Sequence, residues 1–139
     1  MRTQSGFSLM ELLIAVVIAG ILLAVAVPTY QSYSNTTRRA VAASCLVELS
    51  QFMERVYTAN MVYNLNSGVA TALPASQCRQ TLADTYTFSV SAEPQTYTLS
   101  AAPKGSQSSD SSCGTLTINQ AGVRAANSDS SDAKVKSCW

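Results

Sequence analysis

The sequence predicts an α+β protein in which a long N-terminal helix packs on an antiparallel β-sheet of about four strands. Three observations point to this class. An apolar run near the N-terminus is long enough to cross a membrane as a helix, and helical periodicity continues beyond it to about residue 60. Four short segments of alternating apolar and polar residues then follow, separated by turns. One apolar helix face covering one face of such a sheet gives a two-layer domain.

Composition limits the functions that this chain can have. Its 139 residues are 47% hydrophobic and 12% charged, with no histidine and a formal net charge of +1. Intrinsic disorder is excluded because it requires low hydrophobicity and high net charge. The absence of histidine removes imidazole catalysis and the commonest metal ligand. A net charge near zero provides no overall attraction to nucleic acid or to an anionic membrane.

The shortage of charge is concentrated near the N-terminus. From Phe7 to Val27 only Ser8, Glu11 and Gly20 are not hydrophobic. A helix of this length spans about 31 Å, close to the thickness of a bilayer's hydrocarbon core. An ionised carboxylate at the centre of a membrane helix costs at least about 2.5 kcal/mol. Any interpretation of this segment therefore has to explain Glu11.

Three interpretations of the apolar segment compete. A secretory signal peptide would be cleaved after the small-x-small sequence Ala24-Val25-Ala26, but its basic region would be weak and its apolar run unusually long. A simple membrane anchor accounts for the length. Both leave Glu11 unexplained, whereas the third interpretation gives this carboxylate a partner.

The third interpretation comes from the stretch Gly6-Phe7-Ser8-Leu9-Met10-Glu11, followed by apolar residues up to Pro28. It resembles the class III signal of type IV prepilins and pseudopilins. The resemblance implies the type IV pilin fold, a prepilin peptidase that cuts after Gly6, and methylation of the new N-terminus at Phe7. It further implies a leader at 1–6, a transmembrane and filament-core half of the helix at 7–34, and a periplasmic head at 35–139.

The resemblance also assigns roles to Glu11 and Pro28. It implies that Glu11 pairs with the N-terminus of a neighbouring subunit in the filament core. A buried ion pair adds little net stability but strongly penalises wrong alignment, so Glu11 would set the register of assembly. Pro28 removes one helical hydrogen bond and would kink the helix, or else the helix simply ends there.

From residue 29 the helical pattern becomes amphipathic and is expected to end near Asn60. Ser34-Asn35-Thr36-Thr37 is a run of poor helix formers, where a bend or local melting is plausible. A connecting loop is expected from the end of the helix near Asn60 to about Asp84. The apolar stripe expected to face the sheet comprises Val41, Cys45, Leu49, Phe52 and Val56.

Alternation of apolar and polar residues predicts the strands Tyr86–Val90, Tyr97–Ala101, Thr115–Asn119 and Gly122–Ala125. Short turns between them imply an antiparallel meander. The serine- and aspartate-rich stretches 105–112 and 127–132 are expected to be loops. Asp129 and Asp132 match no calcium-loop spacing, so a calcium site there is not favoured and no metal or other cofactor is expected.

The four cysteines are expected to form two disulfides in a domain outside the cytoplasm, and they allow three pairings. We favour Cys45–Cys78, which would pin the loop to the helix, together with Cys113–Cys138, which would clamp the C-terminal tail onto the sheet. The alternative is that Cys45 is a free, buried thiol that packs as a small hydrophobe. A zinc site is disfavoured because no two cysteines are close in sequence and histidine is absent.

The stretches from Gln95 to Ala101 and from Cys113 to Val123, with the ending Cys138-Trp139, resemble the minor pilins that include DNA-uptake receptor pilins. The leading functional hypothesis is therefore a type IV pilus subunit, of the minor rather than the major class, for pilus assembly and for adhesion, twitching motility or DNA uptake. It would reside in the inner membrane and then in the filament at the cell surface. A type II secretion pseudopilin is an alternative, and no constellation of catalytic residues suggests an enzyme.

A second alternative is DNA binding at the pilus surface. The candidate contacts are basic residues in the second half of the chain: Arg79, Lys104, Arg124, Lys134 and Lys136. Asp110, Asp129 and Asp132 interleave with them, and the loops offer few aromatic residues for stacking. A solvated face of mixed charge is therefore the favoured interpretation of these residues.

Overall fold

The structure is a computed structural model that describes residues 8–139. It divides into two compact units, Met1–Ser34 and Asn35–Trp139, which we call the N-terminal segment and the head unit. Helix α1 (Leu9–Asn60) contains residues of both. It continues through Pro28 and through residues 34–37, so neither a helix end at Pro28 nor local melting at 34–37 is observed. The end predicted near Asn60 is confirmed.

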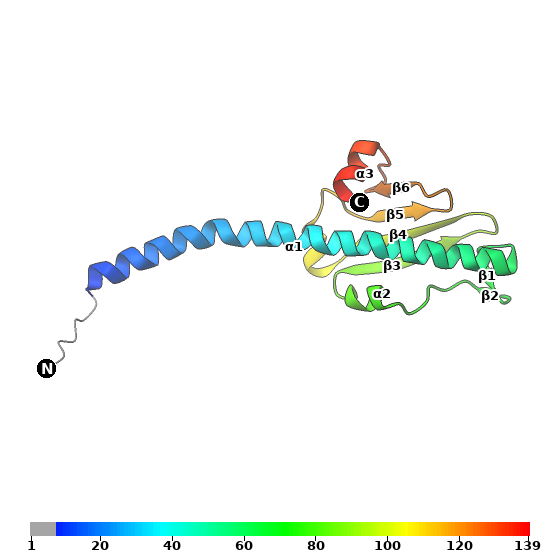
Figure 1. Ribbon diagram of the computed structural model, residues 1–139, viewed down its shortest axis with the longest axis horizontal. Coiled ribbons are helices and arrows are strands. Elements are labelled where there is room, and N and C mark those ends of the chain that lie inside the picture. Colours follow the sequence, from blue (N-terminus) through cyan, green and yellow to red (C-terminus); the bar gives the residue numbers. More distant parts are fainter. Residues whose placement is uncertain (1–7) are drawn as a thin grey trace. The chain divides into compact units, whose positions relative to one another are not determined.

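The head unit contains a four-stranded antiparallel sheet (Figure 1). Its strands are β3 (Tyr86–Ala92), β4 (Tyr97–Pro103), β5 (Leu116–Asn119) and β6 (Arg124–Ala126), hydrogen-bonded in sequence order. Leu99 pairs with Val90 on one side and with Ile118 on the other. The predicted meander is confirmed, with strand ends that lie within two residues of the predicted ones.

Short elements occupy the regions that were expected to be loops. Strands β1 (Leu65–Asn66) and β2 (Val69–Ala70) form a small hairpin, and helix α2 (Gln77–Thr81) follows it. A 3₁₀ helix, η1 (Gly105–Ser109), follows β4, and helix α3 (Asp132–Cys138) ends the sequence. The loop expectation was therefore wrong for parts of 61–84 and 105–112, whereas residues 127–131 lie outside the helices and the four-stranded sheet, as expected, and α3 begins only at Asp132. Each element has few residues, so sequence periodicity could not reveal it.

Residues 35–60 of α1 lie across one face of the sheet (Figure 1) and bury a stripe of side chains against it. Cys45, Leu49 and Val56 are buried as predicted. Phe52 is partly buried and packs against the core, whereas Val41 is 37% exposed, so the predicted stripe is wrong at Val41. The buried face also includes residues on the neighbouring side of the helix, namely Ala42, Ala43, Leu46 and Met53.

Side chains from alternate positions of the strands complete the core. Tyr86, Tyr97, Leu99, Leu116 and Ile118 face α1 and are buried. Every residue of this core lies in the head unit. The head unit therefore has the apolar interior that a domain needs in order to fold by itself.

Two disulfides cross-link separate segments of the head unit. Cys45 of α1 is bonded to Cys78 of α2, and Cys113 is bonded to Cys138 of α3. This is the favoured pairing, and the alternative of a free Cys45 thiol is wrong. One bond holds the segment between α1 and β3 against the helix, whereas the other fixes α3 to the chain just before β5.

Candidate assembly and nucleic-acid-binding sites

Glu11 lies in the first turn of α1, and the structure describes the chain on both sides of it. The N–H groups of Glu11 and Leu12 donate to the Ser8 carbonyl at 3.1 and 3.2 Å. A carboxylate here interacts favourably with the positive end of the helix dipole. Ser8 and Glu11 also have the S-x-x-E spacing of a capping box, a helix-start signal that the sequence analysis missed. The predicted cleavage and methylation residues, Gly6 and Phe7, lie outside the described residues.

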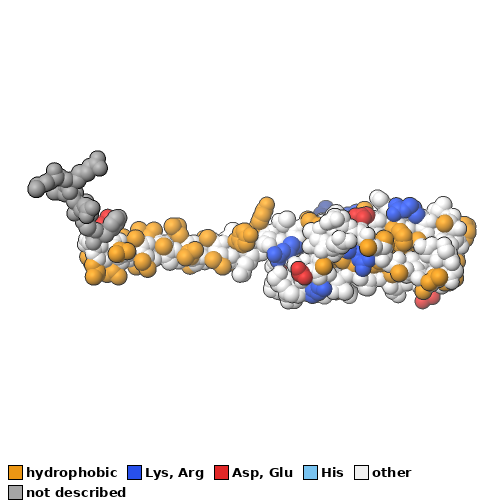
Figure 2. Space-filling view, turned by 90° about the horizontal axis from the view of Figure 1, so that it is seen from below, with side chains coloured by type: hydrophobic (Ala, Val, Ile, Leu, Met, Phe, Trp, Pro, Cys, Tyr) orange, Lys and Arg blue, Asp and Glu red, His pale blue; other side chains and the backbone are white. Residues whose placement is uncertain are grey.

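The N-terminal segment exposes a continuous apolar surface (Figure 2). Its large apolar side chains between Leu9 and Val27 are 51–74% exposed. By length and composition, α1 qualifies as a helix that could cross a membrane. Exposed apolar surface of this extent is a feature of sites that contact lipid or another protein.

Pro28 lies within the helix near the end of this apolar surface. A proline has no N–H, so it cannot donate to the carbonyl of Ala24. One residue later, the Thr29 hydroxyl donates to the Val25 carbonyl at 2.9 Å. The missing hydrogen bond leaves a point at which the helix can bend more easily.

The five basic candidate residues fall into two groups that belong to opposite edges of the sheet. Arg79 and Lys104 line one pocket beside the edge strand β3. Arg124 is in the other edge strand, β6, and Lys134 and Lys136 are in α3, which packs against β6. The five residues therefore do not form the single stripe that the sequence suggested.

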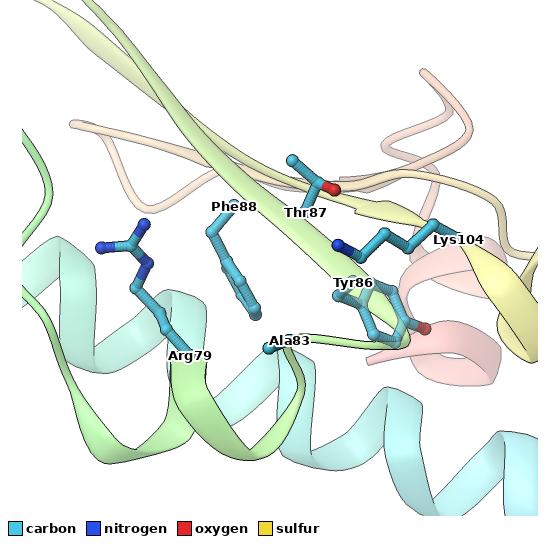
Figure 3. A pocket seen from close by; sticks show the side chains of 6 residues that line it. All are labelled: Arg79, Ala83, Tyr86, Thr87, Phe88 and Lys104. Carbon is cyan, nitrogen blue, oxygen red and sulfur yellow. The ribbon is translucent and has the colours of Figure 1, made fainter.

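The pocket beside β3 has a volume of about 210 Å³ (Figure 3). In Figure 3 the ring of Phe88 lies between the Arg79 guanidinium and the Lys104 ammonium group. No carboxylate is among the six lining residues, Arg79, Ala83, Tyr86, Thr87, Phe88 and Lys104. Two cations, two aromatic rings and the Thr87 hydroxyl suit a ligand that combines negative charge with an apolar part.

The Arg79 side chain is held in place by the segment that precedes α2. Its Nη1 donates to the carbonyls of Leu73 and Pro74 at 3.0 and 2.6 Å. Arginine has five N–H donors, of which Nη1 carries two. Its Nε and Nη2 groups are therefore available to an anion, and the guanidinium is already oriented before a ligand arrives.

The second basic group is partly occupied by contacts within the head unit. The Arg124 guanidinium lies 5.2 Å from the centre of the Trp139 ring, a cation–π contact. The indole N–H of Trp139 donates to the Ala125 carbonyl at 3.0 Å, and the Lys134 ammonium donates to the Ser112 carbonyl. Lys136 is exposed in the last turn of α3.

The acidic residues that interleave with these cations have local partners of their own. Asp110 forms a mostly buried salt bridge with Arg39 at 3.2 Å. Asp129 accepts from the Ser131 backbone N–H at 2.8 Å, and this hydrogen bonding lowers the pKa of its carboxyl. Within residues 8–139 no three histidine, cysteine or acidic side chains are grouped as a metal site would require.

A buried polar cluster fixes η1 against α1, and the sequence analysis missed it. The Gln107 amide is fully buried and donates to the Asn35 carbonyl at 3.0 Å and to the Asp110 carboxylate at 3.2 Å. Burial, with a further contribution from the charge of Asp110, raises the pKa of the nearby Tyr86 to about 12. The burial of Gln107 could not be predicted, because a single glutamine in a serine-rich stretch produces no periodic pattern.

A second cluster ties the end of α1 to the start of β4. The hydroxyls of Tyr63 and Tyr97 both donate to the Glu54 carboxylate, at 3.1 and 3.2 Å. The Tyr63 ring stacks on Tyr57, with 4.6 Å between ring centres. Burial and the Glu54 charge raise the pKa of Tyr97. We assign these residues a structural role. Their rings pack on one another, and the hydroxyls of Tyr63 and Tyr97 donate to one carboxylate.

Comparison with known proteins identifies relatives of both parts of the chain. Residues 1–27 match the prokaryotic N-terminal methylation motif, and residues 28–117 match the family described as type IV minor pilin ComP, DNA uptake sequence receptor. A fimbrial protein of Pseudomonas aeruginosa is 50% identical over 44 residues, which is 32% of this chain and 29% of that protein. The type IV major pilin protein PilE1 of Neisseria gonorrhoeae is 37% identical over 78 residues, 55% of this chain and 36% of that protein.

The match thus covers about a third of the length of these curated relatives. A solved type IV pilin from Shewanella oneidensis resembles this structure with a TM-score of 0.52 and 29% sequence identity. That likeness covers 76% of this chain and 97% of the Shewanella chain. The long N-terminal helix and the four-stranded antiparallel sheet are therefore the type IV pilin fold, in a family of structural subunits. Since the ComP model matches more than half of the sequence, the chain belongs to the ComP family of type IV minor pilins.

Proposed function

We propose that this minor pilin resides in the inner membrane, enters a type IV pilus after processing, and contributes a DNA-binding head to DNA uptake. The observation that carries the proposal is the family match at 28–117, which includes the pocket formed by Arg79 and Lys104. The exposed apolar helix of the N-terminal segment supports residence first in lipid and then among other pilin helices.

The processing step is supported by the methylation motif at 1–27. Prepilin peptidase would cut after Gly6 and leave a methylated amine on Phe7, which would pair with Glu11 of a neighbouring subunit during assembly. Mass spectrometry of the mature protein tests this step. A methylated chain that starts at Phe7 supports it, whereas a chain that starts at Val27 would indicate an ordinary signal peptide.

The DNA-binding step is supported by the pocket beside β3. Its two cations fit the phosphate backbone, which supplies most of the affinity in non-specific DNA binding. The second basic group is the weaker candidate because Arg124 and Lys134 already contact groups within the head unit. A solvated face of mixed charge is the competing interpretation, and DNA-binding measurements separate the two.

The test measures binding of double-stranded DNA to the head unit, residues 35–139, over a range of salt concentrations. Removing one cation that neutralises a phosphate should lower the slope of log K against log salt by about 0.9. Arg79→Gln/Lys104→Gln should therefore reduce the slope by about 1.8. The matched control, Arg124→Gln/Lys136→Gln, makes the same change of charge at the opposite sheet edge and should have the smaller effect. Absence of binding by the unaltered head unit at low salt would reject the DNA-binding proposal.

A type II secretion pseudopilin shares the N-terminal signature and remains the second candidate function. The match of residues 28–117 to pilus minor pilins favours the pilus. Detection of the subunit in sheared, purified pili distinguishes the two assemblies, because a pseudopilin would be absent from them.

A further inference from the structure

The apolar surface of the N-terminal segment is interrupted by Glu11 near its start, after Leu9 and Met10, and is followed by two tyrosines at its other end. From Leu12 to Val27 the sequence is apolar except for Gly20, and Glu11 precedes it. At the other end, Tyr30 and Tyr33 follow Pro28, with side chains that are 73% and 72% exposed. Helical residues three apart share a face, so the two rings form one aromatic patch, which we call the tyrosine pair.

The separation of these boundaries matches the thickness of a bilayer. Glu11 is in the first turn of α1, and the helix continues without interruption to Tyr30. The rise of 1.5 Å per residue places these two residues about 28 Å apart along the axis. The hydrocarbon core of a bilayer is about 30 Å thick. When one boundary lies at the edge of the hydrocarbon, the other therefore lies at the opposite edge.

The chemistry at each end suits a membrane–water interface. Tyrosine is enriched at the headgroup level because its ring is apolar and its hydroxyl is polar. A carboxylate is costly at the bilayer centre, but the cost falls toward the interface.

We propose that the tyrosine pair anchors the unassembled subunit in the headgroup layer of one leaflet and so holds Glu11 in the headgroup layer of the other. The partner of this surface is a phospholipid bilayer. The inference depends on the membrane residence in the proposed function. It adds that the helix of the N-terminal segment has a fixed depth in the bilayer. At that depth Glu11 remains hydrated until assembly, so the carboxylate does not oppose insertion.

Depth can be measured in the full chain, reconstituted in phosphatidylcholine–phosphatidylglycerol vesicles whose lipids carry bromine at defined acyl positions. Trp139 is the only tryptophan, so Trp139→Phe provides a background without tryptophan emission. Tyr30→Trp then reports on the proposed interface, and Ile21→Trp reports on a site about midway between the boundaries. The tryptophan introduced by Tyr30→Trp should be quenched most by bromine near the headgroup, and that from Ile21→Trp by bromine near the bilayer centre. Strongest quenching from the centre for Tyr30→Trp, or none at any depth, would overturn the proposal.

Anchoring is tested with Ile21→Trp as the depth reporter. Tyr30→Leu/Tyr33→Leu should move this reporter by roughly one helical turn, about 5 Å, because the ring hydroxyls that hold positions 30 and 33 at the headgroup level are lost and two leucines favour the hydrocarbon instead. The matched control, Gln31→Leu/Ser34→Leu, adds two leucines at the same spacing and keeps the tyrosine pair, so the reporter should stay in place. An unchanged depth in the tyrosine variant would overturn the anchoring role. Failure of the unaltered chain to float with vesicles would instead reject the membrane residence itself.

Discussion

Removal of the Cys113–Cys138 disulfide is expected to weaken the head unit both globally and at α3. The two cysteines are 25 residues apart. The chain-entropy relation for a loop of this size gives about 3.5 kcal/mol of stabilisation. Cys113→Ala/Cys138→Ala should therefore lower the free energy of unfolding by up to about 3.5 kcal/mol. With an m-value of about 1.5 kcal/mol per M, the urea midpoint falls by roughly 2 M.

The local effect can be read from Trp139, the only tryptophan in the sequence. Its ring contacts Arg124, and its N–H donates to the Ala125 carbonyl, so its fluorescence reports whether α3 is docked on β6. Without the disulfide, the fluorescence transition should precede the far-UV circular dichroism transition, because α3 has only seven residues and loses its covalent link to the chain before β5.

The matched control is Cys45→Ala/Cys78→Ala, whose cysteines are 33 residues apart. The same relation gives a similar stabilisation, about 3.7 kcal/mol. In this control the fluorescence and dichroism transitions should coincide. An unchanged midpoint after loss of Cys113–Cys138, or an early fluorescence transition in both variants, would refute the reasoning.

Three other expectations test the core, the buried polar cluster and assembly. Leu46→Ala empties a fully buried site and should cost about 2–5 kcal/mol of unfolding free energy in urea titrations, whereas Val41→Ala should cost under about 1 kcal/mol; equal costs would contradict the assignment of the buried face. Burial raises the pKa of Tyr86 from 10.0 to about 12, so the unfolded state loses its proton first and stability falls as pH rises from about 10 to about 12. Thermal melts of Tyr86→Phe should show a smaller loss of stability between pH 10 and 12 than the unaltered protein. Identical pH profiles for the two proteins would argue against the raised pKa of Tyr86. Glu11→Ala should permit cleavage and membrane insertion but reduce recovery in sheared pili, and normal recovery would exclude the charge-pair role.

The long helix and the meander could be predicted because each depends on a local pattern. The apolar run fixes the helix up to Val27, and alternation in Tyr86–Ala92 and Tyr97–Pro103 marks each strand by itself. The meander then follows from short turns. The exact buried face of α1 could not be predicted. The predicted stripe by itself satisfies the helical spacing of apolar residues, so nothing in the pattern required Leu46 and Met53, on the neighbouring side, to be buried as well.

The missed features depend on contacts between distant parts of the chain. Helix α3 is too short to show periodicity and is held by a disulfide and by Trp139. The position of Gln107 depends on Asn35, which lies 72 residues earlier. Similarly, the separation of Arg79 and Arg124 follows from β3 and β6 being opposite edges of one sheet. No spacing in the sequence carries that information.

The disulfide connectivity bears on the order in which the two bonds would form if, as proposed, the head is exported across the inner membrane. The pairs Cys45–Cys78 and Cys113–Cys138 join consecutive cysteines. A chain that crosses a membrane from its N-terminus presents Cys45 and Cys78 to an oxidase before any strand of the four-stranded sheet has emerged. This first bond can therefore close while the later cysteines are still inside. Of the three possible pairings, this is the one that oxidation in order of emergence would produce, so an exported head would need no reshuffling of its disulfides.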